Sequence, residues 1–291
     1  MCVVALLIAI GDRCHNVPVS DRLPSIPPFL YGTAWKEDDT ERLTRLAIEN
    51  GFRGIDTANQ RKHYYEAGVG AAVAAAIRDG IVRREELFLQ TKFTYRRGQD
   101  TRLPYNPMAD IGTQVRRSFE GSLEHLQVAS IDSFLLHGPS RGRGLGADDH
   151  EAWQAMEKLP VRFLGISNVS LEQLELLCAS VRVRPAFVQN RCFASTRWDA
   201  AVRAFCRQHG IVYQGFSLLT ANVTELRSAR FREVVKRSGR TPAQVVFRFA
   251  MQAGIVPLTG TTDPAHMRED LAAGDFTLSN DDVKAIENVA G

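Results

Sequence analysis

Short apolar runs alternate with longer segments of helical periodicity along most of the chain. The β-prone runs number eight and lie at 27–33, 52–58, 87–93, 131–138, 162–168, 186–192, 211–217 and 255–260. Such alternation is typical of parallel βαβ units. Because eight strand-then-helix repeats favour a closed barrel over an open sheet, the sequence predicts an α/β fold, the (β/α)8 or TIM barrel.

The segments between the runs carry apolar residues at helical spacing. We expect helices at 39–50, 66–80, 111–127, 150–159, 170–180, 197–210, 230–254 and 264–274, with a last one after Ser279. Sequence signals mark several helix ends, with N-caps at Asp39, Ser170 and Ser279 and glycine stops at Gly51, Gly80 and Gly210. These signals support the number of repeats.

No segment of the 291-residue chain has the composition of a linker between domains. We therefore expect a single-domain barrel over 21–291, preceded at 1–20 by an N-terminal extension or a short strand. The apolar start MCVVALLIAIGD is too short to span a bilayer and lacks the basic residues of a signal peptide. With no CxxC pair among five cysteines, the chain fits a reducing, cytoplasmic compartment and no membrane partner.

Charge changes this picture little. The formal net charge is +3, and the basic residues are scattered, which gives no support to a nucleic-acid partner.

The segment 138–150 is rich in Gly and Arg and follows the fourth run, so we expect a long βα loop that shapes a pocket. Its GRGLG stretch resembles a phosphate-binding loop only weakly, because no P-loop lysine follows.

Three successive runs end in side chains that are costly to bury without a purpose. Asp56, Lys92 and His137 end the second, third and fourth runs. Taken singly, each has an ordinary explanation as a cap, a surface-reaching lysine or a core histidine. Because the carboxyl ends of barrel strands meet on one face, the three together favour a shared site. The HxH and clustered carboxylate spacings of a metal site are absent from the sequence, so we expect no metal.

Several short motifs occur in the order of a known family. They are GFRGIDTANQRKHYYEAGVG (51–70), LQTK (89–92), LLHGPS (135–140), GISN (165–168), VQN (188–190) and GFSLL (215–219). From about Gly32 to its end, the chain resembles the aldo-keto reductases. The resemblance implies a (β/α)8 barrel that reduces aldehydes or ketones to alcohols by hydride transfer from NADPH or NADH, with a tyrosine as general acid.

The resemblance implies a catalytic tetrad of Asp56, a tyrosine, Lys92 and His137. A hydride added to a carbonyl leaves negative charge on oxygen, which a proton donor and preorganised dipoles must meet. A tyrosine, with a pKa of about 10, is a weak acid at neutral pH, and a neighbouring ammonium favours its phenolate. Lys92 would supply that ammonium, Asp56 would hold Lys92, and His137 would orient the carbonyl.

The position of the tyrosine departs from the family pattern. Arg61 stands five residues after Asp56, where the family has its tyrosine, and Tyr64 and Tyr65 follow at eight and nine residues. We favour Tyr64 over Tyr65 because the family often places this tyrosine two or three residues before a glutamate, here Glu66. The longer loop also brings Arg61, Lys62 and His63 near the cleft, either as a solvated loop or as a means of attracting anionic substrates.

The cofactor residues follow from the resemblance. Gly32, Thr33 and Asp56 would help to bind the cofactor. The nicotinamide carboxamide would contact Ser167, Asn168 and Gln189, and the ring would stack on Phe216. Ser217 and Leu219 would approach the pyrophosphate, and Glu269 and Asp270 the adenine.

The eighth run departs from the family, since VPLTGTTDPAHMRED (256–270) lacks the lysine and arginine that grip the 2′-phosphate of NADP. Thr259 or Gly260 replaces the lysine. The Thr261 and Thr262 hydroxyls, His266 and the helix N-terminus near Asp263 are the remaining phosphate ligands. We expect NADPH as the favoured cofactor and NADH as the alternative.

We expect the substrate to be a small-molecule carbonyl compound that binds in a wide, shallow pocket. We expect Trp35, Phe93, His137 and the loop 138–150 to bound it. The protein would be a monomer or a weak homo-oligomer. The alternative hypothesis is a cofactor-binding regulatory barrel, similar to a channel β-subunit, with little turnover.

Overall fold

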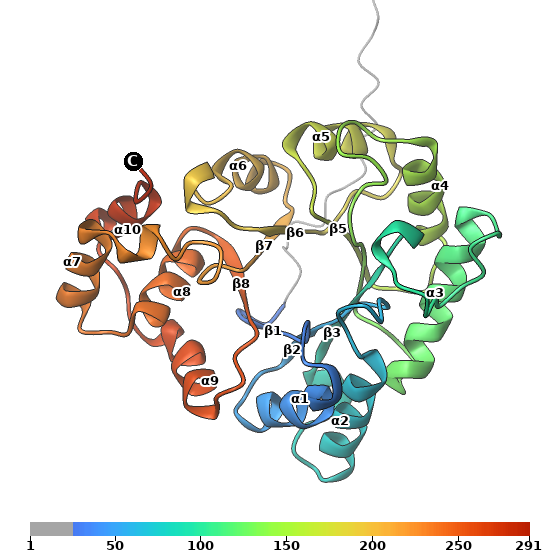
Figure 1. Cartoon of the computed structure of the whole chain (residues 1–291), viewed down its shortest axis with the longest axis horizontal. Coiled ribbons are helices and arrows are strands. Elements are labelled where there is room, and N and C mark those ends of the chain that lie inside the picture. The colour runs from blue at the N-terminus through green and yellow to red at the C-terminus, as the bar shows by residue number, and fades with distance from the viewer. Residues whose placement is uncertain (1–25) are drawn as a thin grey trace, which may run out of the picture.

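The computed structural model describes residues 26–291. Eight parallel strands close into a barrel in chain order, and β8 pairs back with β1 (Figure 1). The strands are β1 (Leu30–Gly32), β2 (Gly54–Asp56), β3 (Phe88–Phe93), β4 (Ser133–Leu136), β5 (Phe163–Ser167), β6 (Phe187–Arg191), β7 (Val212–Phe216) and β8 (Ile255–Thr259). The predicted (β/α)8 barrel is confirmed, and each strand lies within one of the eight apolar runs. The extension or strand expected at 1–20 lies outside the described residues.

Helices surround the barrel in a ring that follows the chain (Figure 1). They are α1 (Thr40–Glu49), α2 (Glu66–Arg78), α3 (Ile111–Leu126), α4 (Ala147–Met156), α5 (Leu171–Ser180), α6 (Ala200–Gln208), α7 (Ala229–Ser238), α8 (Pro242–Gln252), α9 (Pro264–Leu271) and α10 (Asn280–Glu287). Short 3-10 helices lie at Glu37–Asp39, Arg84–Glu86, Arg96–Gly98, Ala194–Thr196, Glu225–Arg227 and Ala272–Asp275.

Most of the predicted helix ends agree with the structure. The Ser170 and Ser279 hydroxyls accept hydrogen bonds from backbone N–H groups at the starts of α5 and α10. The three glycine stops all have positive φ, namely Gly51, Gly80 and Gly210. Asp39 occupies the N-cap position of α1, but its carboxylate makes no capping hydrogen bond and pairs with Arg42 instead, because a 3-10 turn runs directly into the helix.

Two of the differences from the predicted helices have a clear local cause. The segment 230–254 forms two helices, because Gly239 adopts φ of 61° after α7 and Thr241 caps α8 with Pro242 in its first turn. The fourth helix begins at Ala147 and not at 150, because the buried Asp149 carboxylate accepts a hydrogen bond from Gly146 N.

The interior of the barrel changes from apolar to polar along the strands. Leu30, Phe88 and Phe187 begin β1, β3 and β6 and form a small apolar cluster with Leu258. Because side chains alternate along a strand, residues two positions further on face the interior as well. Two of these, Gln90 in β3 and Gln189 in β6, are polar and lie toward the carboxyl ends of the strands, where TIM-barrel sites are built.

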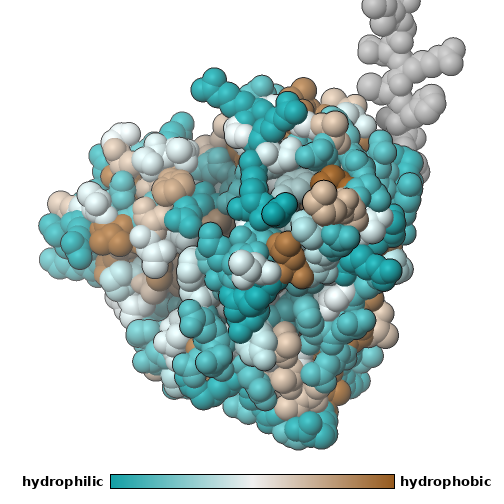
Figure 2. Space-filling model, turned by 45° about the vertical axis from the view of Figure 1, so that its right-hand side comes forward, coloured by the Kyte–Doolittle hydropathy of each residue, from teal (hydrophilic) through white to brown (hydrophobic). Residues whose placement is uncertain are grey.

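The surface is mainly hydrophilic on the face that Figure 2 draws, apart from the residues in grey, with hydrophobic residues in small groups. Of the described residues, Trp35 and Met108 are the most exposed large hydrophobic side chains, at 71% and 84%. Between residues 26 and 291, none of the helices is long and apolar enough to cross a bilayer.

Candidate functional site

A groove with a volume of about 1130 Å³ opens at the carboxyl ends of the strands. Most of the residues expected at the site line it. They are Gly32, Trp35, Asp56, Tyr64, His137, Ser167, Asn168, Gln189, Phe216, Ser217, Leu219, Thr259, Gly260, Thr261, Thr262, His266, Glu269 and Asp270. The groove therefore joins the ends of β1, β2, β4, β5, β6, β7 and β8.

Three predicted side chains, those of Thr33, Lys92 and Phe93, and one predicted loop do not line the groove. Phe93 is fully buried and packs on Tyr95 and Tyr105, because it follows Lys92 in β3 and side chains alternate, so its placement on the substrate pocket is wrong. The Thr33 hydroxyl is also buried and donates to the backbone oxygen of Asp56. The side chains of Phe93 and Thr33 are thus buried next to the site and do not line the groove.

The loop 138–150 does not bound the groove, contrary to the prediction. Its ends are tied together by Asp149, which accepts hydrogen bonds from Ser140 N at 2.6 Å and Gly146 N at 2.7 Å. Arg141, Gly142 and Arg143 are exposed. This hydrogen bonding pulls the loop back onto the start of α4.

Lys92 and Asp56 form a buried ion pair beneath the groove. The Lys92 ammonium lies 2.8 and 2.7 Å from the two oxygens of Asp56 and 2.8 Å from the backbone oxygen of Thr57. Burial lowers the pKa of Lys92, and the Asp56 carboxylate opposes that shift. Because all three ammonium protons have acceptors, Lys92 is held in one position at the carboxyl end of β3.

Three glutamines form an amide layer around Asp56. Gln90 Nε2 and Gln189 Nε2 donate to Asp56 Oδ1 at 2.7 and 2.9 Å. Both amides also donate to Gln214 Oε1, at 2.8 and 2.9 Å. Donors aimed at a carboxylate favour its ionised form, so this layer supports the Asp56 anion. The sequence analysis missed Gln90 and Gln214, although a spacing of two places Gln90 on the same face of β3 as Lys92.

Gln214→Leu is expected to lower the free energy of unfolding by about 1–3 kcal/mol. The leucine keeps the volume but removes the acceptor of two buried amides and the donor that satisfies Gln90 Oε1. Urea denaturation measures the change, with the exposed Gln208→Leu on α6 as the matched control. Equal losses in the two variants would show that the amide layer adds no stability.

Tyr64, and not Tyr65, lies beside this ion pair. The Tyr64 ring centroid is 5.3 Å from Lys92 Nζ and 5.8 Å from the His137 ring. Burial and the Asp56 charge raise the pKa of Tyr64, so the phenol holds its proton. Tyr65 precedes α2 and carries the Arg61 guanidinium 4.2 Å above its ring, and it lines neither the groove nor the smaller cavity described below.

His137 is a neutral imidazole at the end of β4. Its Nδ1 lies 2.6 Å from the Thr94 hydroxyl, a partner that the sequence analysis missed. Burial, with the Lys92 charge, lowers the pKa of His137 to about 3. A neutral ring carries one N–H, and a Thr94 hydroxyl that donates to Nδ1 places this proton on Nε2.

The imidazole of His137 is expected to stay neutral from pH 8 down to about pH 4 in an NMR titration. The unfolded chain binds this proton near pH 6.5. Stability is therefore greatest above pH 6.5 and falls as the pH drops toward 3, by at most about 1.4 kcal/mol per pH unit from this group. His137→Gln identifies the resonance, and a midpoint near 6.5 in the folded protein would contradict the burial argument.

Two of the strand ends that line the groove have left-handed backbone. Asn168 and Ser217 adopt φ of 52° and 57° at the ends of β5 and β7, and the Asn168 amide donates to the His137 backbone oxygen. Such strained backbone is typical of binding sites. Burial raises the pKa of Asp270 to about 6. The groove also includes residues that sequence reasoning did not find, namely Lys36, Arg191, Thr241, Pro242 and Ala243.

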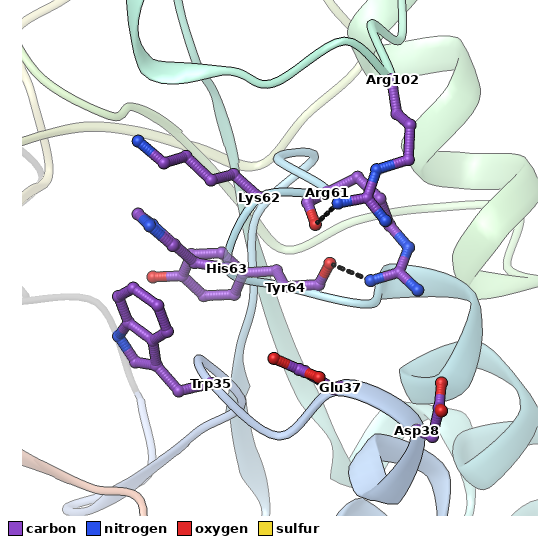
Figure 3. Close-up of a pocket in the computed structure, with 8 residues that line it drawn as sticks. All are labelled: Trp35, Glu37, Asp38, Arg61, Lys62, His63, Tyr64 and Arg102. Atoms are coloured by element: carbon purple, nitrogen blue, oxygen red, sulfur yellow. Dashed lines mark hydrogen bonds between the residues drawn. The ribbon is translucent and has the colours of Figure 1, made fainter.

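A smaller cavity of about 170 Å³ lies at the mouth of the groove (Figure 3). Lys62, His63 and the Tyr64 hydroxyl point to one side of it, where Trp35 also lies. The ring centroids of His63 and Trp35 are 3.9 Å apart. Arg61 and Arg102 lie on the opposite side, where Arg61 donates to the Tyr64 backbone oxygen and Arg102 to that of Arg61. Figure 3 thus shows Lys62 and His63, but not the Arg61 side chain, on the side of the Tyr64 hydroxyl.

Within residues 26–291, no three His, Cys, Asp or Glu side chains gather in a way that could hold a metal ion. The groove contains a protonated phenol and a neutral imidazole, and a buried ion pair lies beneath them. Together these groups can donate a proton and stabilise negative charge on a bound oxygen.

The chain is similar to known proteins over most of its length. The model of the Aldo/keto reductase family matches residues 30–290. The 9,11-endoperoxide prostaglandin H2 reductase of Trypanosoma cruzi (strain CL Brener) is 30% identical over 287 residues, which cover 95% of this chain and 91% of that protein.

Solved structures show the same barrel. The Bombyx mori aldo-keto reductase in complex with NADP has a TM-score of 0.77 at 24% identity, covering 91% of this chain and 89% of that one. An aldo-keto reductase complexed with NADPH has a TM-score of 0.76 at 25% identity, covering 91% of this chain and 84% of that one. Because the family match spans nearly the whole described barrel, the chain belongs to the aldo/keto reductase family.

Proposed function

We propose that this protein reduces aldehydes or ketones to alcohols with hydride from NADPH, using Tyr64 as the general acid. Membership of the family makes the chain a carbonyl-reducing oxidoreductase. The role of Tyr64 as the acid rests on one observation. Tyr64 and His137 lie next to each other beside the Lys92–Asp56 ion pair. These four side chains come from three separate parts of the chain, and three of them line one groove.

The groove suits a nicotinamide dinucleotide. Gln189, Ser167 and Asn168 supply amides and hydroxyls at the end beside the tetrad, where Phe216 offers a ring for stacking. At the other end, Glu269 and Asp270 are the candidates for adenine. A solved relative contains NADPH, which favours NADPH, with NADH as the alternative. When bound, the dinucleotide supplies the hydride that adds to the carbonyl carbon.

The chain's own residues handle the developing charge on oxygen. Tyr64 donates its proton to that oxygen, and the positive charge of Lys92 stabilises the phenolate that remains. Asp56 keeps Lys92 in place and is itself held by the amide layer. His137, neutral at physiological pH, orients the carbonyl by donating a hydrogen bond.

The substrate is a small carbonyl compound that enters beside Trp35 and His63. Trp35 has φ of 62°, unusual for a bulky side chain, and its backbone N–H donates to the His63 backbone oxygen at 2.7 Å. The two rings and Tyr64 therefore line the entrance together. Lys62 lies beside them and favours substrates that carry a negative charge.

Turnover with 4-nitrobenzaldehyde tests this function. Mixing the protein with NADPH or NADH and following absorbance at 340 nm is expected to show oxidation that depends on the aldehyde. A protein that binds NADPH but oxidises it with none of a panel of aldehydes and ketones would instead be the regulatory barrel. A protein that binds neither dinucleotide would contradict both functions.

A further inference from the structure

Charge is distributed unevenly among the loops at the mouth of the groove. The loops after β2, β3 and β4, at 57–65, 94–110 and 137–146, contain seven Lys and Arg residues and two Asp residues. The loops after β8 and β1, at 260–263 and 33–39, contain one basic residue and four acidic residues. All of these loops surround one opening, because they follow the carboxyl ends of the barrel strands. The mouth is therefore positive on the side of β2, β3 and β4, and this side attracts anions.

Lys62 brings this positive charge next to the reacting groups. Its side chain lies in the small cavity on the side of the Tyr64 hydroxyl (Figure 3). The acidic residues of the same cavity, Glu37 and Asp38, lie away from the Lys62 ammonium (Figure 3). Within residues 26–291, that ammonium takes part in no hydrogen bond or ion pair. Its charge is therefore available to a ligand.

The two arginines of the small cavity are engaged elsewhere. Arg102 forms an ion pair with Asp100 and donates to the backbone oxygen of Arg61. The Arg61 guanidinium lies over the Tyr65 ring, on the side opposite the Tyr64 hydroxyl. Neither arginine therefore presents its charge to a substrate beside that hydroxyl.

The turn that carries Lys62 is held in place by backbone hydrogen bonds. The N–H groups of His63 and Tyr64 both donate to the Gln60 backbone oxygen, and Trp35 N donates to that of His63. Burial, with the Lys62 charge, lowers the pKa of His63, so its imidazole is mostly neutral at pH 7. Of the described residues that line this cavity, Lys62 is therefore the cation on the side of the reacting groups.

We propose that the carbonyl substrate carries an anionic group, a carboxylate or a phosphate, and that Lys62 binds this group. The inference rests on the proposed function and specifies its substrate. With the carbonyl oxygen between Tyr64 and His137, the rest of the molecule extends past the Trp35 and His63 rings toward the mouth. An anion that reaches Lys62 there uses the free donors of the ammonium and pairs its charge.

The role of Lys62 differs from that of the tetrad. The charge of a carboxylate or phosphate does not change while the carbonyl is reduced. Lys62 therefore stabilises the bound substrate and the transition state equally, which lowers KM and leaves kcat unchanged. A residue that only shaped the loop would affect charged and neutral substrates alike.

Three aldehydes of similar shape test the proposal. They are the anionic 4-carboxybenzaldehyde and 4-formylphenyl phosphate and the neutral methyl 4-formylbenzoate. Lys62→Met is expected to lower kcat/KM for the anionic aldehydes by about 3- to 10-fold, through KM, and to leave the ester within about 2-fold. Comparing one aldehyde between two proteins cancels its intrinsic reactivity. The anionic aldehyde with the larger loss identifies which of the two groups Lys62 prefers.

Three further variants serve as controls. Lys62→Arg should retain the preference for the anionic aldehydes, and Lys62→Glu should weaken their binding further by repulsion. Lys236→Met, at an exposed position on α7, removes a positive charge elsewhere and should behave as the wild type. Raising the ionic strength should reduce the preference in the wild type more than in Lys62→Met, because salt screens exposed charges.

Unchanged KM values for both anionic aldehydes in Lys62→Met would overturn the inference and leave the proposed function intact, since the ester would still be reduced. An equal loss for the neutral ester would also overturn it, because the effect would then not depend on charge. A wild-type protein that binds NADPH but reduces none of the three aldehydes would instead count against the proposed function itself.

Discussion

Tyr64→Phe is expected to lower the kcat of carbonyl reduction by about 10²- to 10⁴-fold while leaving the dinucleotide affinity nearly unchanged. The phenylalanine keeps the ring beside His137 and above Lys92 but removes the only proton that Tyr64 can give. Absorbance at 340 nm measures turnover, and calorimetric titration measures binding of NADPH.

Tyr65→Phe is the matched control for this change. Its ring packs under Arg61 and lies outside both cavities, so its hydroxyl should be dispensable. A Tyr65→Phe protein without turnover, beside an active Tyr64→Phe protein, would transfer the acid role to the neighbouring residue.

Lys92→Met is expected both to abolish turnover and to lower the free energy of unfolding by about 3–5 kcal/mol. The substitution leaves the buried Asp56 carboxylate with amide donors but without its cation. The phenolate of Tyr64 also loses the positive charge that stabilises it. Urea denaturation measures the stability, and the 340 nm assay measures turnover.

The double variant Lys92→Met/Asp56→Asn separates the two effects. Removing the second charge should restore part of the stability but none of the activity, because the tetrad still lacks its ammonium. Arg117→Met breaks the exposed pair with Glu120 and should cost less than about 1 kcal/mol. If Lys92→Met were as stable as this control, the buried pair would not be coupled as its geometry indicates.

The face drawn in Figure 2 gives no specific support to the regulatory alternative. Hydrophobic residues on the face in Figure 2 lie in small groups, whereas a stable protein interface buries a broad, complementary patch. The groove, by contrast, gathers groups whose protonation states suit proton donation, a protonated phenol and a neutral imidazole.

The sequence by itself determined the barrel and predicted most of the residues that line the groove. Each strand and helix is marked by the spacing of its own apolar residues, which is a local property of the chain. Asp56 and His137 could be placed in one site because both stand at the ends of parallel strands, and barrel closure brings those ends to one face. The same reasoning placed Lys92 in this site, because Lys92 occupies an inward position of β3.

Only the tertiary structure decided which neighbouring residue faces the groove. Tyr64 and Tyr65 are adjacent, and the turn that begins at Gln60, whose backbone oxygen accepts from Tyr64 N, directs one ring inward. The retraction of the loop 138–150 likewise depends on tertiary contacts, the hydrogen bonds that Asp149 accepts from Ser140 N and Gly146 N.

Contacts between residues far apart in the chain could not be predicted from the sequence either. Gln90 meets Gln214, and Lys36 reaches the carbonyl of Gly260, across separations of 124 and 224 residues. Apolar periodicity says which face of an element is buried but not which polar groups meet inside the barrel. That choice depends on strand register and side-chain reach, and it determines here where the buried charges of the groove lie.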